Sequence, residues 1–227
     1  MTILCIETST NCCSAAICQD GVVVANRENF AGANHASELP VFIEQLLAEA
    51  QANAWILDAV ALSQGPGSYT GLRIGTSIAK GICYGLNIPL IPVDTLKILC
   101  AAIAEEAPSD ALLCPMLDAR RMEVYTALYT QTLEQQSNVV AKVIDEESFA
   151  EELRNRNIYF FGNGAEKCQS VIASANAHFV AEILPQAKYM GKLAEQTLSL
   201  NIKEMAYYEP FYLKEFVPAP SHVKGLK

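Results

Sequence analysis

The stretch SQGPGSYTGLRIGTSIAKGICYG, residues 63–85, constrains the fold of this chain more than any other part of the sequence. It follows the apolar run 58–62, which is typical of a buried strand. Pro66 with its flanking glycines predicts a tight turn, and Ser68 predicts the cap of a helix that begins at Tyr69. A strand, a glycine turn and a capped helix in this order present backbone N–H groups to an anion.

The predicted helix after this turn is rich in small residues. A glycine inside a helix costs about 1 kcal/mol relative to alanine. The small residues are Gly71, Gly75, Ser77, Ala79, Gly81 and Gly85. Such a helix must be closely approached by another segment. We expect that it packs on its own sheet or forms a helix–helix interface, within the protein or with a partner.

Composition limits the class of protein. The chain has 227 residues, of which 51% are hydrophobic, enough for one large domain or two lobes. No apolar run approaches the roughly 20 residues of a membrane helix, and the first residues lack a basic flank, so we expect neither membrane attachment nor a signal peptide. The net charge of −9 predicts that this chain does not bind the phosphate backbone of nucleic acid by itself, so another chain would have to supply the binding surface.

The cysteines favour a reducing compartment, and with the few histidines they give no sign of a metal site. The eight cysteines form no C-x-x-C pair, and only three histidines are present. No metal site can be inferred from such spacing, so we expect a cytoplasmic protein without a metal of its own.

The first half of the chain predicts three antiparallel strands and then alternating helices and strands. The expected strands are residues 2–7, 13–18, 22–25, 58–62 and 88–93, and the expected helices are residues 37–50, 69–84 and 95–106. Ser37 is the expected cap of the first helix, with Pro40 in its first turn. His35, just before that helix, is expected to be a capping or surface residue.

The second half repeats this order. Strands are expected at residues 112–117, 123–129, 139–144 and 158–161, and helices at residues 146–154, after 162–164 and at 186–200. A duplicated lobe with a cleft between the copies explains the repetition. We therefore predict an α/β fold with a first lobe of residues 1–106 plus 187–227 and a second lobe of residues 107–186. The tail 208–214 is expected to cross back to the first lobe.

Three segments carry a family resemblance: ILCIETSTNCCSAAI, LSQGPGSYTGLRIG and MLDARRMEVYTALY, with FFGNGA and PFYLKE in agreement. They resemble the bacterial TsaB (YeaZ-type) family, subunits of the machinery that makes N6-threonylcarbamoyladenosine in tRNA. The resemblance covers essentially the whole chain. It implies the actin-like ATPase (ASKHA) fold, with two ribonuclease-H-like lobes and mixed sheets.

The resemblance also implies a non-catalytic subunit that binds and activates its relative TsaD. TsaE, an ATPase, would join the complex, tRNA would be bound only through it, and the free chain would form a homodimer. ATP and a metal ion would be handled by the partners, with no cofactor in this chain. The implied interface lies on the helices 37–50 and 69–84, at Leu39, Phe42, Leu46, Tyr69, Leu72, Arg73, Gly75, Thr76, Ala79 and Lys80.

A vestigial nucleotide or phosphate site is the other expectation from these motifs. Its candidate residues are Glu7, Thr8, Ser9, Gly65, Gly67, Ser68, Asp118 and Arg120. For the loop after Glu7, a plain polar hairpin is an equal alternative. Arg120 stands where actin-like ATPases place the glycine of an Asp-x-Gly turn, so it would either fill the pocket or supply a positive charge of its own. We expect it to fill the pocket or to have a polar structural role. The histidine pair that binds metal in TsaD corresponds here to Thr95 and Leu99, which cannot replace imidazole.

Other functions fit parts of the sequence less well. An active actin-like phosphotransferase or ATPase would use Glu7 and Asp118 for metal and nucleotide. A dinucleotide-binding oxidoreductase would use the glycines at 65, 67 and 71, but the third glycine is one residue late for the fingerprint. No Walker A lysine pattern occurs, which excludes a P-loop. Composition alone would support only an α/β binding module.

Overall fold

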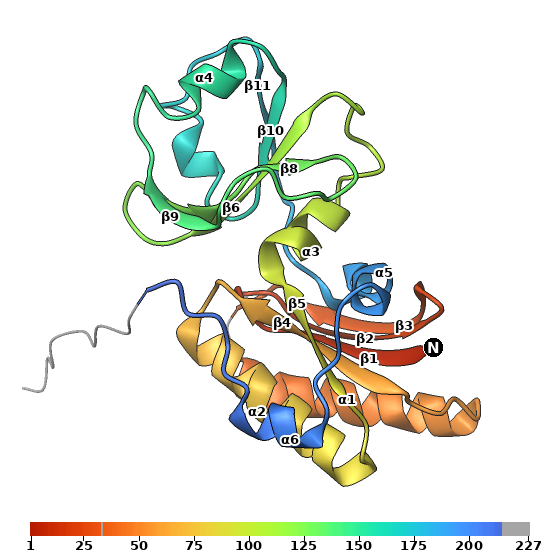
Figure 1. The fold of residues 1–227 in the computed structure, drawn as a ribbon. Helices are drawn as coiled ribbons and strands as arrows, with labels where there is room; N and C mark the ends of the chain where they lie inside the picture. Colours follow the sequence, from red (N-terminus) through yellow and green to blue (C-terminus); the bar gives the residue numbers. More distant parts are fainter. Residues whose placement is uncertain (33, 215–227) are drawn as a thin grey trace, which may run out of the picture.

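The computed structural model describes residues 1–32 and 34–214. It consists of two lobes, each built on one sheet, joined by the helix α3 and by the chain that returns to the first lobe (Figure 1). Within the described residues, no helix has both the length and the apolar composition that a membrane span requires.

The first lobe is a five-stranded mixed sheet in the order β3-β2-β1-β4-β5. The central strand β1 pairs antiparallel with β2 and parallel with β4, and Asp20 and Gly21 form the predicted turn between β2 and β3. The strands are β1 (Thr2–Glu7), β2 (Cys13–Gln19), β3 (Val22–Asn29), β4 (Ala59–Gly65) and β5 (Leu90–Asp94).

Helices cover both faces of this sheet. Alternation along β1 sends Leu4 and Ile6 toward α1 and α2, and Ile3 and Cys5 toward α5 on the opposite face (Figure 1). These helices are α1 (His35–Ala52), α2 (Tyr69–Leu86), α5 (Gly191–Glu195) after the 3-10 turn η2 (Ala187–Tyr189), and α6 (Ile202–Tyr207) beside α2.

The second lobe repeats the strand order of the first. Its main path is β11-β10-β6-β7-β9, with β6 in the central place that β1 takes in the first sheet, and the short β8 pairs with β6. The predicted duplication is therefore confirmed. The elements are β6 (Leu112–Asp118), β7 (Glu123–Thr126), β8 (Tyr129–Thr130), β9 (Val140–Val143), α4 (Ala150–Leu153), β10 (Ile158–Phe161), η1 (Glu166–Cys168) and β11 (Ala177–Val180).

The helix α3 (Thr95–Ala101) packs against both sheets. Ile98 belongs to the core of the first lobe, whereas Leu96 and Leu99 pack with Phe161 of the second. Asp94 caps α3 by accepting from the Leu96 and Lys97 amides, as expected of Asp94 or Thr95. The lobes thus share apolar packing in addition to their covalent connection.

The two halves of α2 differ in how their glycines are used. A Cβ on Gly71 would overlap the carbonyl oxygen of Thr8, and one on Gly75 would overlap the Thr8 hydroxyl. A Cβ on Gly81 or Gly85 would meet nothing within 4 Å. The first half of α2 therefore packs closely on its own lobe, and the second half has open space outside it.

The start of α1 differs from the prediction. The helix begins at His35 after the N-cap Asn34, so Ser37 lies inside it and donates to the Asn34 carbonyl, and Pro40 falls beyond the first turn. His35 is only 4% exposed, and its Nε2 lies 2.7 Å from the Thr10 carbonyl oxygen. Its assignment as a capping or surface residue was wrong, because this long-range contact with the β1–β2 loop has no local sequence signal.

Several predicted helices are shorter than expected. The helix predicted to run from 95 to 106 ends at Ala101 and continues as turns. The helices predicted at 146–154, after 162–164 and at 186–200 reduce to α4, η1, and η2 with α5. The prediction missed β11 and α6, and the strand expected at 123–129 is split into β7 and β8. Ser148 shows one cause, because its hydroxyl bonds to the Asp145 amide and carboxylate and holds a turn where helix was predicted.

The contrast within α2 gives a stability test. Gly71→Ala forces a methyl group against a backbone carbonyl that cannot move independently, and it should lower the free energy of unfolding by about 1–3 kcal/mol. In Gly81→Ala the added methyl group enters open space, and alanine forms helix more readily than glycine. This variant should therefore raise the free energy of unfolding by about 0.5–1 kcal/mol. Urea denaturation measures both values. Equal effects of the two variants would contradict the assigned packing.

Candidate functional site

A cleft of about 540 Å³ lies between the two lobes. The first lobe lines it with Ser9, Gly67 and Ser68, and the second lobe lines it with Asp118 and Arg120. Candidate site residues predicted from both halves of the chain thus line the same cleft. The remaining nominated residues, Glu7, Thr8 and Gly65, are buried behind this surface.

The turn before α2 makes its hydrogen bonds within the chain. Ser68 Oγ accepts from the Gly71 amide at 3.2 Å, which confirms the predicted cap, and the Ser68 amide donates to the Ser9 carbonyl at 2.7 Å. A Cβ on Gly67 would lie 2.5 Å from that same carbonyl oxygen. The glycine turn therefore seats the chain's own β1–β2 loop, and these amides are not presented to an anion.

Glu7 is fully buried under this loop. Its Oε1 accepts from the Ser9 amide at 2.5 Å, while Oε2 and the Ser9 hydroxyl have no hydrogen-bond partner among the described residues. Burial raises the pKa of Glu7 to about 7, outweighing the nearby polar groups of Ser9, Ser63 and the Thr8 backbone, which lower it. The carboxyl group is thus enclosed by protein and is half protonated near neutral pH.

Asp118 is engaged by its own lobe. Its Oδ1 pairs with the Lys167 ammonium and accepts from the Arg120 amide at 3.1 Å. Arg120 has a φ of +73°, in the left-handed region that favours the glycine of an Asp-x-Gly turn. Its side chain is exposed and lines the cleft. Arg120 therefore has a structural role through its backbone, and its side chain places a positive charge at the cleft.

The segment 208–214 crosses to the first lobe as predicted and then reaches the second. The Phe211 amide donates to the Gln64 carbonyl at 2.7 Å, and the Tyr212 ring lies 4.9 Å from that of Tyr69. Lys214 forms an ion pair with Glu123 of β7. This tail lines one wall of the cleft.

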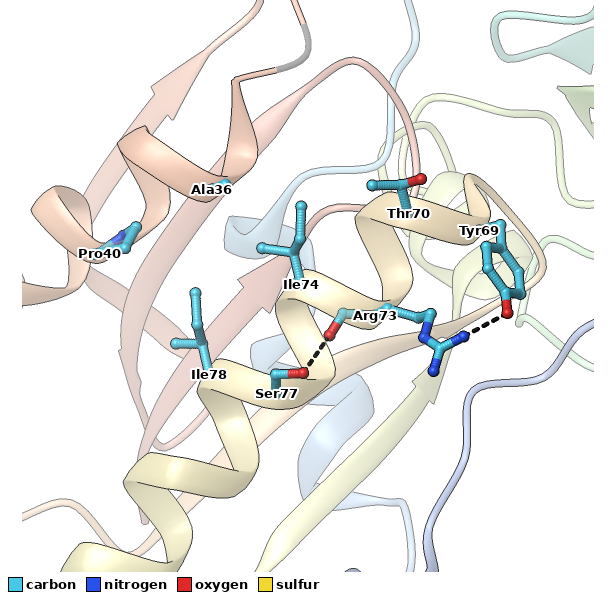
Figure 2. A pocket seen from close by; sticks show the side chains of 8 residues that line it. All are labelled: Ala36, Pro40, Tyr69, Thr70, Arg73, Ile74, Ser77 and Ile78. Carbon is cyan, nitrogen blue, oxygen red and sulfur yellow. Dashed lines mark hydrogen bonds between the residues drawn. The ribbon is translucent and has the colours of Figure 1, made fainter. Parts of the chain in front are cut away.

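A second hollow, the α1–α2 groove, lies on the outer face of the first lobe and has a volume of about 500 Å³. Ile74 and Ile78 of α2 face Ala36 and Pro40 of α1 across it, as Figure 2 shows. Thr70, Arg73 and Ser77 complete it along α2, with the Arg73 guanidinium bonded to the Tyr69 hydroxyl (Figure 2). The sequence analysis missed most of these residues, although Ile74 and Ile78 are spaced one helical turn apart.

The predicted interface residues divide by burial. Tyr69, Arg73 and Lys80 reach the surface, and Phe42 is half-buried. The others are buried in the folded chain: Leu39, Leu46, Leu72, Gly75, Thr76 and Ala79. The resemblance identified the two helices but not which of their side chains point inward, so the interface itself stays a prediction.

The positions that correspond to the metal-binding histidine pair are both buried. Thr95 Oγ1 accepts from the Gly65 amide at 3.1 Å, and Leu99 packs in the core between the lobes. In the part of the chain that the structure describes, no three His, Cys, Asp or Glu side chains come together as a metal-binding group.

Comparison with known proteins assigns the chain to a family. Residues 24–219 match the family of TsaD, tRNA N6-adenosine threonylcarbamoyltransferase. The chain belongs to this family. Within it the chain is of the bacterial TsaB (YeaZ) type: the Haemophilus influenzae tRNA threonylcarbamoyladenosine biosynthesis protein TsaB is 28% identical over 96% of this chain and 95% of that protein.

Solved structures agree with this assignment. YeaZ from Pseudomonas aeruginosa superposes with a TM-score of 0.76 and 26% identity, covering 93% of this chain and 99% of that chain. An activator of 2-hydroxyisocaproyl-CoA dehydratase from Clostridium difficile, solved with bound ADPNP, gives a TM-score of 0.50 at 9% identity, covering 91% of this chain and 96% of that one. The fold is the predicted actin-like ATPase fold with two mixed sheets.

The buried Glu7 of this TsaB-type chain predicts a specific dependence of stability on pH. Its pKa is about 7 in the folded chain against 4.5 for an ordinary glutamate, so the folded state holds the proton more tightly. This contribution to stability is complete below about pH 4.5 and is lost as the pH rises to 7, by roughly 3 kcal/mol. Glu7→Gln should keep the bond to Ser9 and remove this dependence. Urea denaturation between pH 5 and 8 measures it, and an unchanged slope in the variant would contradict the assignment.

Proposed function

We propose that this chain acts in tRNA threonylcarbamoyladenosine biosynthesis as a non-catalytic subunit that binds and activates TsaD. The observation that carries the proposal is the α1–α2 groove, an open apolar hollow lined by residues 69–78 of α2, with the open-spaced Gly81 following along the helix. A hollow lined by isoleucine, proline and alanine on a soluble lobe favours a protein partner. The name of the Haemophilus influenzae relative supports the pathway, and the match of this chain to the TsaD family supports a relationship with the proposed partner.

The state of the interlobe cleft supports a non-catalytic role. The Ser68 amide donates to the β1–β2 loop, the Gly71 amide donates to the Ser68 hydroxyl, Glu7 is enclosed, and Asp118 is paired with Lys167. A chain that uses these groups for its own packing has few left to orient a phosphate or a nucleophile. We therefore propose that ATP, metal and tRNA chemistry belong to the partners, with TsaE joining the complex and a homodimer forming through the same groove when the chain is alone.

An active actin-like ATPase is the second candidate, and the size of the cleft, about 540 Å³, is the observation in its favour. Purified protein with magnesium and ATP distinguishes the two proposals. Turnover that is lost in Asp118→Asn would support the ATPase and contradict the non-catalytic subunit.

The interface proposal is tested by adding an arginine to the exposed face of α2. Ser77 and Gly81 are exposed, so Ser77→Arg and Gly81→Arg should leave the free energy of unfolding within about 0.5 kcal/mol of its original value. Both should weaken association with TsaD about tenfold or more, because a large charged side chain would block the groove and its margin. Co-purification with TsaD and a reconstituted tRNA modification assay, each with one protein omitted in turn, provide the measurements.

Asn155→Arg is the matched control, since it adds the same charge at an exposed position of the second lobe. It should retain both association and modification. If Ser77→Arg and Gly81→Arg bind TsaD as well as this control does, the groove is not the docking site.

A further inference from the structure

A third hollow, the α2–tail pocket, has a volume of about 470 Å³ and lies between α2 and residues 206–212. Arg73, Thr76 and Lys80 line it from α2, and Tyr208 and Glu209 line it from the other side. It shares Tyr69, Arg73 and Ser77 with the α1–α2 groove, but its remaining walls are separate from that groove. Its walls combine cationic, hydroxyl and aromatic groups, in contrast to the apolar α1–α2 groove.

Two hydroxyl groups in the pocket lack partners. Thr76 Oγ1, on a residue only 6% exposed, and Tyr208 Oη have no hydrogen-bond partner among the described residues. Burial raises the pKa of Tyr208, so its phenol keeps a proton to donate. Unpaired buried hydroxyls are costly, and a ligand that accepts hydrogen bonds would supply the missing partners of two residues that line one pocket.

Two cations lie on either side of Thr76. Arg73 and Lys80 are two helical turns apart, about 10 Å along the axis, on the same face of α2. Arg73 donates one N–H to the Tyr69 hydroxyl, as Figure 2 shows, and Lys80 donates to the Ala206 carbonyl at 3.2 Å. Each cation has further N–H groups to donate.

Charge also favours an anion in this pocket. Glu209 is the acidic residue in its lining, so its two cations leave a positive balance on a chain whose net charge is −9.

We propose that the α2–tail pocket binds a phosphate group carried by a small molecule. A tetrahedral phosphate offers acceptors in several directions, which suits donors that come from α2 and from the tail. A carboxylate has two oxygens for these four donor groups, and a water molecule would leave the two cations without a counter-charge. The volume of the pocket, about 470 Å³, exceeds that of an inorganic phosphate ion and leaves space for the organic part of a phosphorylated small molecule.

The test uses the full chain and inorganic phosphate as the probe, with potassium chloride at matched ionic strength. Binding is followed by amide chemical shifts in NMR and by calorimetry. Phosphate should cause saturable shifts at α2 and at residues 206–212 that chloride does not cause. Thr76→Val and Tyr208→Phe remove one unpaired hydroxyl each with little change in shape, and each should weaken phosphate binding about tenfold without lowering thermal stability.

Arg154→Gln, a loss of charge at an exposed position of the second lobe, is the control and should bind as the unaltered chain does. The proposal is overturned if phosphate and chloride act alike, or if Thr76→Val and Tyr208→Phe bind as tightly as the control. TsaD association is measured separately from phosphate binding. Absence of phosphate binding therefore does not contradict the α1–α2 groove as the docking site, and loss of the docking proposal does not contradict phosphate binding.

Discussion

The structure depends on the close seating of the β1–β2 loop against the start of α2. The Thr8 hydroxyl donates to the Gly71 carbonyl at 2.8 Å, and the Ser9 carbonyl accepts from the Ser68 amide. Only residues without a Cβ at positions 71 and 75 allow this approach, since a methyl group would overlap Thr8. The contact joins β1, β4 and α2 into one unit, and it takes up the Ser68 amide at the helix N-terminus, the end of a helix that attracts phosphate.

Burial of Glu7 follows from the same contact. Once the loop covers the end of β1, the carboxyl group is removed from water, and the polar groups of Ser9, Ser63 and Thr8 compensate only in part, so its pKa rises to about 7. In the second lobe the corresponding turn is held by Lys167 and by the Arg120 amide. Both halves of the cleft thus use their polar groups for internal structure, which links the fold to the proposed loss of catalysis.

Local signals predicted those parts of the structure that depend on local physics. Ser68 and Asp94 cap their helices as their position in the sequence indicates, and the order of elements revealed the duplicated lobes and the cleft. Two failures involve tertiary choices, and others involve local side-chain turns. His35 is buried by a contact with Thr10, which lies 25 residues away, and Ala79 shows that a small residue on a helix can face the core as readily as a partner. The short helices of the second lobe were lost to side-chain turns such as that of Ser148.

The outer half of α2 carries a cost that the isolated chain does not explain. Gly81 and Gly85 each weaken the helix by about 1 kcal/mol relative to alanine, yet no neighbour within 4 Å would exclude a methyl group at either position. At Gly71 and Gly75 the same cost is offset by the approach of Thr8. By the same reasoning, the partner proposed above would supply the missing neighbour of the outer glycines, with a backbone that approaches α2 as closely as Thr8 does. The two halves of one helix would then serve the two kinds of packing that the sequence left open, one within the lobe and one with a partner.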